Sequence, residues 1–177
     1  MLPYPEPQLR GSDFVLRPFR EGDFEAALEF SRDQATDPWV PPLPADDPVA
    51  VVELFEQYRR DDQLLHLVIA EELGDAYLGE VMVMMYDHQM GEYGCGVVQR
   101  ARGRGIATEA LRMFAGWSAK ALDIQRLQAL VALQNVPALL LAERVGFRRE
   151  GVLRAYWAHE GGRVDAVILS MLPAEFP

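Results

Sequence analysis

One short segment of the sequence combines glycines and arginines in a way that could bind an anion. Arg102-Gly103-Arg104-Gly105-Ile106-Ala107 joins a strand-like stretch to a stretch with helical apolar spacing. The first amides of a helix have no partner inside the helix and point outward at the positive end of its dipole. Glycines there let a phosphate approach the backbone, and arginines add charge-assisted hydrogen bonds. The segment therefore predicts a cradle for a pyrophosphate group.

Two familiar phosphate-binding motifs do not fit this segment. No Gly-Lys-Ser/Thr follows it, which excludes a nucleotide P-loop. Its spacing differs from the G-x-G-x-x-G of dinucleotide sites, and its strand does not begin a βαβ unit. On spacing alone, a structural turn with chance arginines remains the alternative.

The rest of the chain contains the strands and helices that must position this segment. Alternating and apolar runs indicate strands at 14–19, 64–70, 77–86, 92–98, 126–133, 147–157 and 163–172. Helical spacing and capping signals indicate helices at 23–32, 46–60, 105–122 and 137–145. The Pro-rich stretch 38–44 is expected to be a packed loop. The order predicts an α/β (α+β) fold with a mixed central sheet and helices on both faces.

Composition limits the class of protein. The 177 residues are half hydrophobic and one quarter charged, as in an ordinary globular domain, and no repeat or linker divides residues 1–177. There is no apolar run of the roughly 20 residues that a membrane helix needs, and no signal-peptide pattern. A single cysteine, Cys95, excludes an internal disulfide and a cysteine-based zinc cluster. We therefore expect a single cytoplasmic domain without a metal and without a membrane partner.

The formal net charge of −10 is unevenly distributed. Residues 1–98 carry 20 acidic and 6 basic side chains, a net charge of −14, whereas residues 99–177 carry 11 basic and 7 acidic ones, a net charge of +4. A nucleic-acid partner normally needs a basic face, so the balance argues against one. The split indicates either a solvated acidic surface or two ligands, with an anion on the second half and a cation facing the first.

Short motifs lie along nearly the whole chain. Arg102, Gly105 and Ala107 occupy the defined positions of a signature Gln/Arg-x-x-Gly-x-Gly/Ala. Further motifs follow in order: 16–19 with Asp23, 92–94, 105–111, Asn135 with 143–147, and 150–154 with Asp165. Together, and in this order, they resemble the GNAT superfamily of acyl-CoA N-acyltransferases, and in particular its RimJ/RimL-like branch. The resemblance implies the GNAT fold, whose central sheet is mixed and mostly antiparallel, and an acetyl-CoA-dependent N-acetyltransferase that needs no metal.

The resemblance also implies roles for particular residues. The backbone amides of Gly103, Arg104, Gly105, Ile106, Ala107 and Thr108 would bind the cofactor's pyrophosphate, and Arg102 would take part in the same site. Backbone groups of Gly96, Val97 and Val98 would pair with its pantetheine arm, and an amide there would stabilise the oxyanion of the reaction. Asn135 would reach the cofactor, although a helix N-cap before Pro137 is the alternative, and both roles are compatible.

Three positions depart from the pattern of the resembled proteins. Ala138 stands where the branch commonly has a serine that could protonate the departing thiolate, and Ala142 stands where many other relatives have a tyrosine. The general acid is therefore unassigned. Gly96 replaces a usual aromatic residue, which predicts a wider cleft near the acetyl group.

Four further side chains are weighed for the site. Glu92 is the candidate general base, since it begins the strand beside the acyl site, and a surface carboxylate is the alternative. Tyr156 and His159 lie near the Gly161-Gly162 turn and are candidates for binding the acceptor. His66 lies inside an apolar strand, which favours a core histidine.

The identity of the acceptor stays open between several classes. The branch favours a protein or peptide α-amine, while the acidic first half also suits a small cation such as a polyamine or an aminoglycoside. Ala138 and Gly96 leave room for a third reading, an acyl-CoA-binding domain without catalytic activity. Dimers are frequent among the resembled proteins, so a homodimer is possible.

Overall fold

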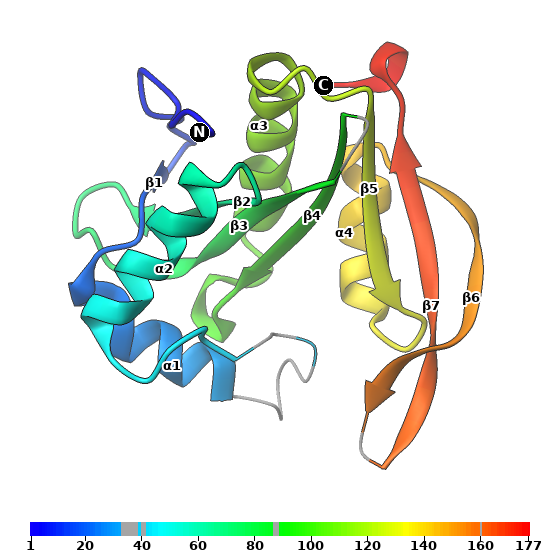
Figure 1. Ribbon diagram of the computed structural model, residues 1–177, viewed down its shortest axis with the longest axis horizontal. Coiled ribbons are helices and arrows are strands. Elements are labelled where there is room, and N and C mark those ends of the chain that lie inside the picture. Colours follow the sequence, from blue (N-terminus) through cyan, green and yellow to red (C-terminus); the bar gives the residue numbers. More distant parts are fainter. Residues whose placement is uncertain (33–38, 40–41, 87–88, 160) are drawn as a thin grey trace.

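The computed structural model describes residues 1–32, 39, 42–86, 89–159 and 161–177. Over these residues the chain forms a seven-stranded sheet with the order β1-β2-β3-β4-β5-β7-β6 (Figure 1). In this part of the chain β4 and β5 are parallel and the other neighbouring strands are antiparallel. The mixed, mostly antiparallel sheet that the sequence predicts is confirmed.

The predicted elements are present, with ends that differ by at most two residues. The strands are β1 (Phe14–Arg17), β2 (Leu64–Glu71), β3 (Tyr77–Tyr86), β4 (Met90–Val97), β5 (Arg126–Ala132), β6 (Arg148–His159) and β7 (Gly162–Met171). The helices are α1 (Phe24–Arg32), α2 (Pro48–Arg60), α3 (Ile106–Ala121) and α4 (Val136–Val145). The predicted loop at 38–44 lies partly outside the described residues, and Trp39 and 42–44 belong to no helix or strand.

Local chemistry explains several of these ends. The Asp47 carboxylate accepts a hydrogen bond from the Ala50 amide at 3.0 Å, and Pro48 occupies the first turn, so α2 begins where its capping residues stand. β1 ends at Arg17 because Pro18 has no amide to donate to a sheet.

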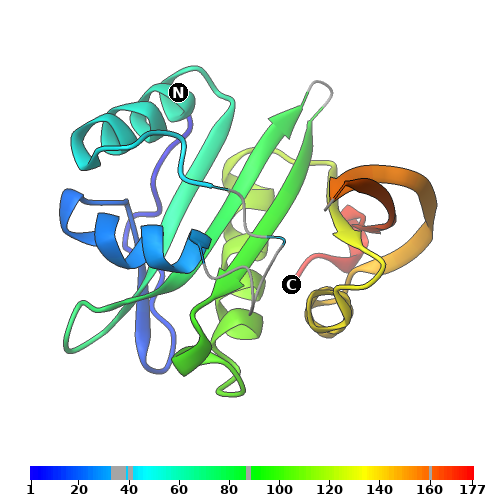
Figure 2. The same cartoon turned by 90° about the horizontal axis from the view of Figure 1, so that it is seen from below.

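The helices cover both faces of the sheet. Alternation along β2 sends Leu65, Leu67 and Ile69 into the core beneath α3 and α4, and it sends Val68 and Ala70 into the core beneath α1 and α2. Figure 2 shows α1 and α2 on one face and α3 on the other. Within the described residues, no helix combines the length and the apolar character needed to cross a membrane.

β4 and β5 pair only at their beginning. In the described chain their register contains Met90 with Arg126, Gly91 with Leu127 and Glu92 with Gln128, after which the two strands diverge (Figure 1). The divergence leaves a gap in the middle of the sheet, directly before the glycine-rich segment.

Candidate active site

The strand β4 presents backbone groups to this gap. The Val98 amide donates to the Leu78 carbonyl at 2.9 Å, and antiparallel pairs alternate between hydrogen-bonded and non-bonded residues. By this alternation, the amide and carbonyl of Gly96 face β3, whereas those of Cys95 and Val97 face the gap. An extended ligand could therefore add to β4 at Cys95 and Val97, as a peptide adds to a sheet edge.

The glycine-rich segment has the geometry of an open helix start. Gly103 and Gly105 have φ angles of 73° and 81°, in the region that favours glycine, and Gly105 is the N-cap of α3. No side chain caps α3 among the described residues. A Cβ placed on either glycine would meet no atom within 4 Å, so the space in front of the helix amides is open.

A cavity of about 430 Å³, which we name the cradle cavity, lies between this segment and α4. It is lined by Cys95, Gly96, Val97, Ala101, Arg102, Gly103, Gly105, Ile106, Ala107, Thr108, Asn135, Pro137, Ala138, Leu141 and Arg144. Most of the residues predicted to bind the cofactor are therefore brought together around one cavity.

Two of the predicted residues lie differently. The Arg104 guanidinium approaches Asp13 at 3.6 Å. Arg104 therefore contributes its backbone, and not its side chain, to the open face of the glycine-rich segment. The Val98 amide is already bonded to Leu78, and the Val98 carbonyl accepts from the Ala101 amide at 2.9 Å. The Val97 carbonyl accepts from Arg102 Nε at 3.3 Å. The register therefore favours the backbone of Cys95 and the amide of Val97 over Gly96 and Val98 for contacts with an extended ligand.

Arg144 is a lining residue that the sequence reasoning missed. It stands in the last turn of α4, and its carbonyl accepts from Arg112 at 2.6 Å. Pro137, Leu141 and Arg144 recur at helical spacing and so share one face of α4. Counting this spacing from Asn135, which was already predicted to reach the cofactor, would have indicated Arg144 as a cation on this side of the cavity.

Asn135 satisfies the N-cap reading and also lines the cavity. Its side-chain oxygen accepts from the Ala138 amide at 3.2 Å, which caps α4. The two readings of Asn135 are thus compatible in the structure.

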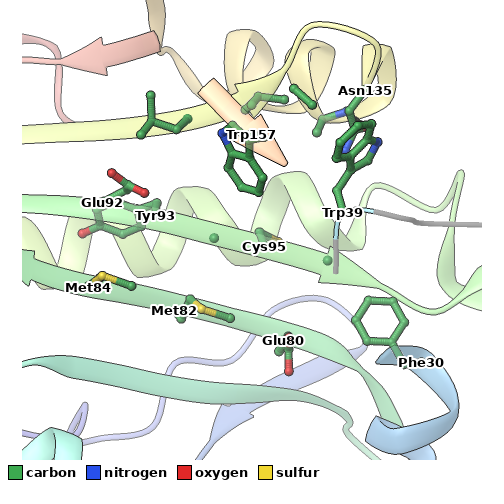
Figure 3. Close-up of a pocket in the computed structure, with 16 residues that line it drawn as sticks. Phe30, Trp39, Glu80, Met82, Met84, Glu92, Tyr93, Cys95, Asn135 and Trp157 are labelled. Atoms are coloured by element: carbon green, nitrogen blue, oxygen red, sulfur yellow. Dashed lines mark hydrogen bonds between the residues drawn. The ribbon is translucent and has the colours of Figure 1, made fainter. Parts of the chain in front are cut away.

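A second cavity, of about 230 Å³, lies on the opposite face of the sheet, beneath α1 (Figure 3). We name it the acceptor-side cavity. Its floor consists of alternate residues of β3 and β4 that pair across the strands, Glu80 with Gly96, Met82 with Gly94 and Met84 with Glu92. Cys95, Gly96, Asn135 and Ala138 line both cavities, so the two cavities meet where β4 and β5 diverge.

Gly96 does not by itself widen this cavity. A Cβ on Gly96 would lie 2.8 Å from the ring of Phe30, a buried residue of α1. The space freed by the missing side chain is therefore occupied by Phe30, which the expectation of a wider cleft did not include.

Glu92 lies at the end of the acceptor-side cavity where β4 and β5 still pair. Its carboxylate accepts from the Gln128 side chain at 2.9 Å. Burial raises the pKa of the neighbouring Tyr86, and the charge of Glu92 raises it further. Glu92 thus lines the acceptor-side cavity, and its role as a base stays a prediction.

Glu80 is a second carboxylate in this cavity, and the sequence reasoning did not select it. It is 8 % exposed, and its Oε2 lies 2.9 Å from His66 Nε2 and accepts from the Tyr77 hydroxyl at 3.2 Å. Burial and the charge of Glu80 raise the pKa of Tyr77, so this hydroxyl remains a donor at neutral pH. The signal available was a glutamate inside an otherwise apolar strand.

His66 is buried, as the sequence predicts for a core histidine. Its ring stacks on Phe55 with centroids 4.0 Å apart. Its Nδ1 is buried and has no hydrogen-bond partner among the described residues.

The residues of β6 near the cavity are shifted from those predicted. Trp157 lines the cavity, whereas Tyr156 is exposed and His159 packs against Trp39 of the lining, with ring centroids 4.5 Å apart. The β6–β7 register shifts between Leu153 and Trp157, which turns Trp157 inward. In the part of the chain that the structure describes, the buried indole N–H of Trp157 has no partner.

Cys95 lies at the meeting point of the two cavities. Burial raises the pKa of its thiol to about 12, so the thiol stays protonated at neutral pH. Cys95 is therefore poorly suited to act as a nucleophile.

Comparisons with known proteins agree with this geometry. The family model described as an acetyltransferase (GNAT) domain matches residues 13–148. An uncharacterised N-acetyltransferase, p20 of Bacillus licheniformis, is 25 % identical over 128 residues, which are 71 % of this chain and 72 % of that protein.

Solved structures of acetyltransferases superpose on this chain. Mycobacterium smegmatis RimJ in complex with CoA-disulfide superposes with a TM-score of 0.79 at 25 % identity, covering 93 % of this chain and 84 % of the other. Spermidine N-acetyltransferase from Vibrio cholerae in complex with CoA and spermine superposes with a TM-score of 0.80 at 20 % identity, covering 94 % and 99 %. The second likeness, at this identity, concerns the fold.

Proposed function

The chain belongs to the acetyltransferase (GNAT) domain family, and from this premise we propose that it transfers an acetyl group from acetyl-CoA to the α-amine of a protein or peptide. The acetyltransferase activity follows from the family, whose enzymes use acetyl-CoA, and from its N-acetyltransferase relatives. The acceptor and the roles of individual residues are the proposal.

The cradle cavity fits the cofactor's charged half. Acetyl-CoA supplies a thioester whose carbonyl carbon an amine can attack. The uncapped start of α3, with open space in front of Gly103 and Gly105, supports binding of the pyrophosphate by the amides up to Thr108. Arg102 and Arg144 line the same cavity and add positive charge.

The gap between β4 and β5 fits the cofactor's pantetheine arm. Backbone groups of Cys95 and Val97 face it and would pair with the amides of the arm. The acetyl group would then lie where the two cavities meet, near Gly96, Asn135 and Ala138. A backbone amide that faces this point would stabilise the oxyanion that develops on the acetyl oxygen.

The observation that carries the choice of acceptor is the indole N–H of Trp157, which lines the acceptor-side cavity and has no partner among the described residues. A buried donor without a partner is destabilising, and an acceptor oxygen on the substrate would relieve this. A peptide has carbonyl oxygens close to its α-amine, whereas a polyamine has none. An α-amine also has a pKa near 7.7–8.0, so a useful fraction is neutral at physiological pH.

A small polycation is the second candidate, and the two cavity carboxylates favour it. Glu80 and Glu92 lie on the same face of the sheet, with Met82 of β3 between them and Met84 beside Glu92. An apolar trough with a carboxylate at each end would suit an alkyl chain with two ammonium groups.

The test is release of CoA thiol from acetyl-CoA with matched acceptors. The panel contains short peptides with free α-amines, the same peptides blocked at the N-terminus but carrying lysine, spermidine, and an aminoglycoside. We expect the free α-amine peptides to react with the highest kcat/KM. A preference for spermidine would replace the first proposal by the second, and thiol release with none of them would overturn both.

A further inference from the structure

We propose that Glu80 binds the ammonium group of the acceptor and takes up its proton, and that His66 and Tyr77 position this carboxylate. The inference rests on the proposed function only in assuming that the acceptor is an amine. It assigns to β3 a role that the sequence reasoning gave to Glu92 of β4.

The register of the sheet places Glu80 beside the reacting centre. Glu80 pairs with Gly96, which lines both cavities and so lies where the acetyl group would meet the amine. Glu92 stands four residues before Gly96 on the extended strand β4, which corresponds to about 13 Å of strand length. In Figure 3, Glu92 lies toward one end of the cavity, while Glu80 lies on the side of Phe30.

The surroundings of Glu80 hold its carboxylate in one orientation. Both hydrogen bonds that the described residues make to it end on Oε2, from His66 and Tyr77. Since Oε2 is held in this way, Oε1 is the atom available to an incoming donor. Glu80 is also a lining residue of the cavity, so an acceptor can approach this side.

The charge of this group calls for a cation from outside the chain. A buried carboxylate is strongly destabilised unless a cation or several donors compensate it. The contact between His66 Nε2 and Glu80 Oε2 fits a ring that carries hydrogen on Nε2 and donates it to the carboxylate. His66 and Tyr77 would then supply hydrogen bonds to Glu80, and the acceptor's ammonium would supply a positive charge.

The proposed proton transfers balance the reaction. The ammonium of the acceptor gives one proton to Glu80 and becomes a neutral amine. The amine nitrogen then forms a bond to the carbonyl carbon of the thioester, and the bond between that carbon and sulfur breaks. The second proton leaves the nitrogen and goes to the departing thiolate, after which Glu80 releases its proton to solvent.

The central experiment compares Glu80→Gln with Glu92→Gln, using the best acceptor from the panel. Glutamine keeps an oxygen that can accept from His66 and Tyr77, so the change removes charge and basicity while retaining shape. We expect Glu80→Gln to lower kcat/KM about 100-fold, the usual size of a general-base effect, and Glu92→Gln to cause a much smaller loss. The shift in melting temperature caused by acetyl-CoA should be the same in both variants and in the parent.

The outcomes separate this inference from the proposed function. If the parent is inactive with every amine, the proposed function fails. If the parent is active and Glu80→Gln retains its kcat/KM, the Glu80 assignment alone fails. A large loss in Glu92→Gln with none in Glu80→Gln would return the role to Glu92. Should Glu80→Gln lose the acetyl-CoA shift, Glu80→Asp, which keeps the charge on a shorter side chain, is measured with the same acceptor. A kcat/KM at the parent's level in folded Glu80→Asp would then contradict the proposed positioning by His66 and Tyr77, because the shorter side chain cannot place its carboxylate in the same way.

The positioning residues have their own test. Tyr77→Phe and His66→Gln should mainly lower kcat, by about three- to tenfold, with little change in the KM for acetyl-CoA. His66→Gln retains a donor near the position of Nε2, whereas His66→Leu does not, so glutamine should rescue part of the activity lost in the leucine variant. Equal activity of the two His66 variants, both folded, would show that the Nε2 hydrogen bond has no positioning role.

Discussion

The two cavities that meet at the gap between β4 and β5 are built from different parts of the chain. The cradle cavity uses backbone and side chains from a stretch between Cys95 and Thr108, completed by the first turns of α4 and by Arg144. The acceptor-side cavity uses side chains from α1, β3, β4, β5 and β6, with Trp39 from a loop, and it shares the start of α4 with the cradle cavity. A site made of backbone groups, here called a backbone site, depends on one short segment of sequence and tolerates few changes. A site made of side chains from distant elements, here called a side-chain site, is assembled by the fold and can vary one residue at a time.

The largest expected effect is on the backbone site. Gly105→Asp places a side chain and a negative charge in front of the α3 amides. The parent should gain about 5–10 °C in melting temperature at 100 times the Kd of acetyl-CoA, since the ligand binds the folded state. Differential scanning fluorimetry should show this gain abolished in Gly105→Asp.

Gly161→Asp is the matched control for backbone strain. Gly161 has a φ of 79°, close to the 81° of Gly105, and a Cβ on it also meets no atom within 4 Å. Both variants should lose similar intrinsic stability, but Gly161→Asp should keep the acetyl-CoA shift. A retained shift in Gly105→Asp would contradict the cradle assignment.

This local encoding explains how much of the site the sequence could predict. The segment from Arg102 to Thr108 carries its own conformational signals, because Gly103 and Gly105 adopt positive φ angles beside a helix start. The strands and helices follow from periodicity and caps such as Asp47. Sequence spacing therefore predicts both the fold and most of the cradle.

The acceptor-side residues carry no comparable local signal. Whether Glu80 or Glu92 lies near the reacting centre depends on the β3–β4 register, which pairs Glu80 with Gly96. The inward turn of Trp157 depends on a register shift in β6 that neither its neighbours nor its hydrophobicity encode. Such properties come from pairing across strands that are distant in the sequence.

An intermediate effect is expected where a single side chain fills the part of the cavity that we propose for the acyl group. Phe30→Leu removes the ring that occupies the space beside Gly96. One methylene in a pocket changes selectivity about tenfold or more, so the ratio of propionyl-CoA to acetyl-CoA turnover should rise by about tenfold. Competition between the two thioesters, analysed by mass spectrometry of the product, measures this ratio.

Gly96→Ala is the opposing change at the same contact. Its Cβ would lie 2.8 Å from the Phe30 ring, which must then shift. We expect Gly96→Ala to lower the ratio of propionyl-CoA to acetyl-CoA turnover. We expect the variant that combines Gly96→Ala with Phe30→Leu to show none of the gain of Phe30→Leu. An unchanged ratio in Phe30→Leu would place the acyl group away from Phe30.

A smaller effect is expected at the meeting point of the cavities. Ala138 lines both cavities and follows Asn135 on the first turn of α4. If protonation of the departing thiolate limits turnover, Ala138→Ser should raise kcat about threefold without changing the KM for acetyl-CoA. Stopped-flow measurement of thiol release gives both constants, and a kcat at or below the parent's would show that proton donation there is already sufficient.

The smallest effect is expected for Cys95, although it is central in position and lines both cavities. Burial raises the pKa of its thiol to about 12, and a raised pKa favours the neutral form, so the nucleophilic thiolate is scarce at every pH below that value. Transfer should therefore pass directly from acetyl-CoA to the amine, and Cys95→Ala should retain kcat/KM within about twofold. Intact-mass spectrometry of the parent mixed with acetyl-CoA alone should detect no acetylated protein. An acetylated parent together with an inactive Cys95→Ala variant would require a thioester on the enzyme. In that case Glu80 would have to serve the second of two transfers, and the division between a backbone site for the cofactor and a side-chain site for the acceptor would no longer describe the chemistry.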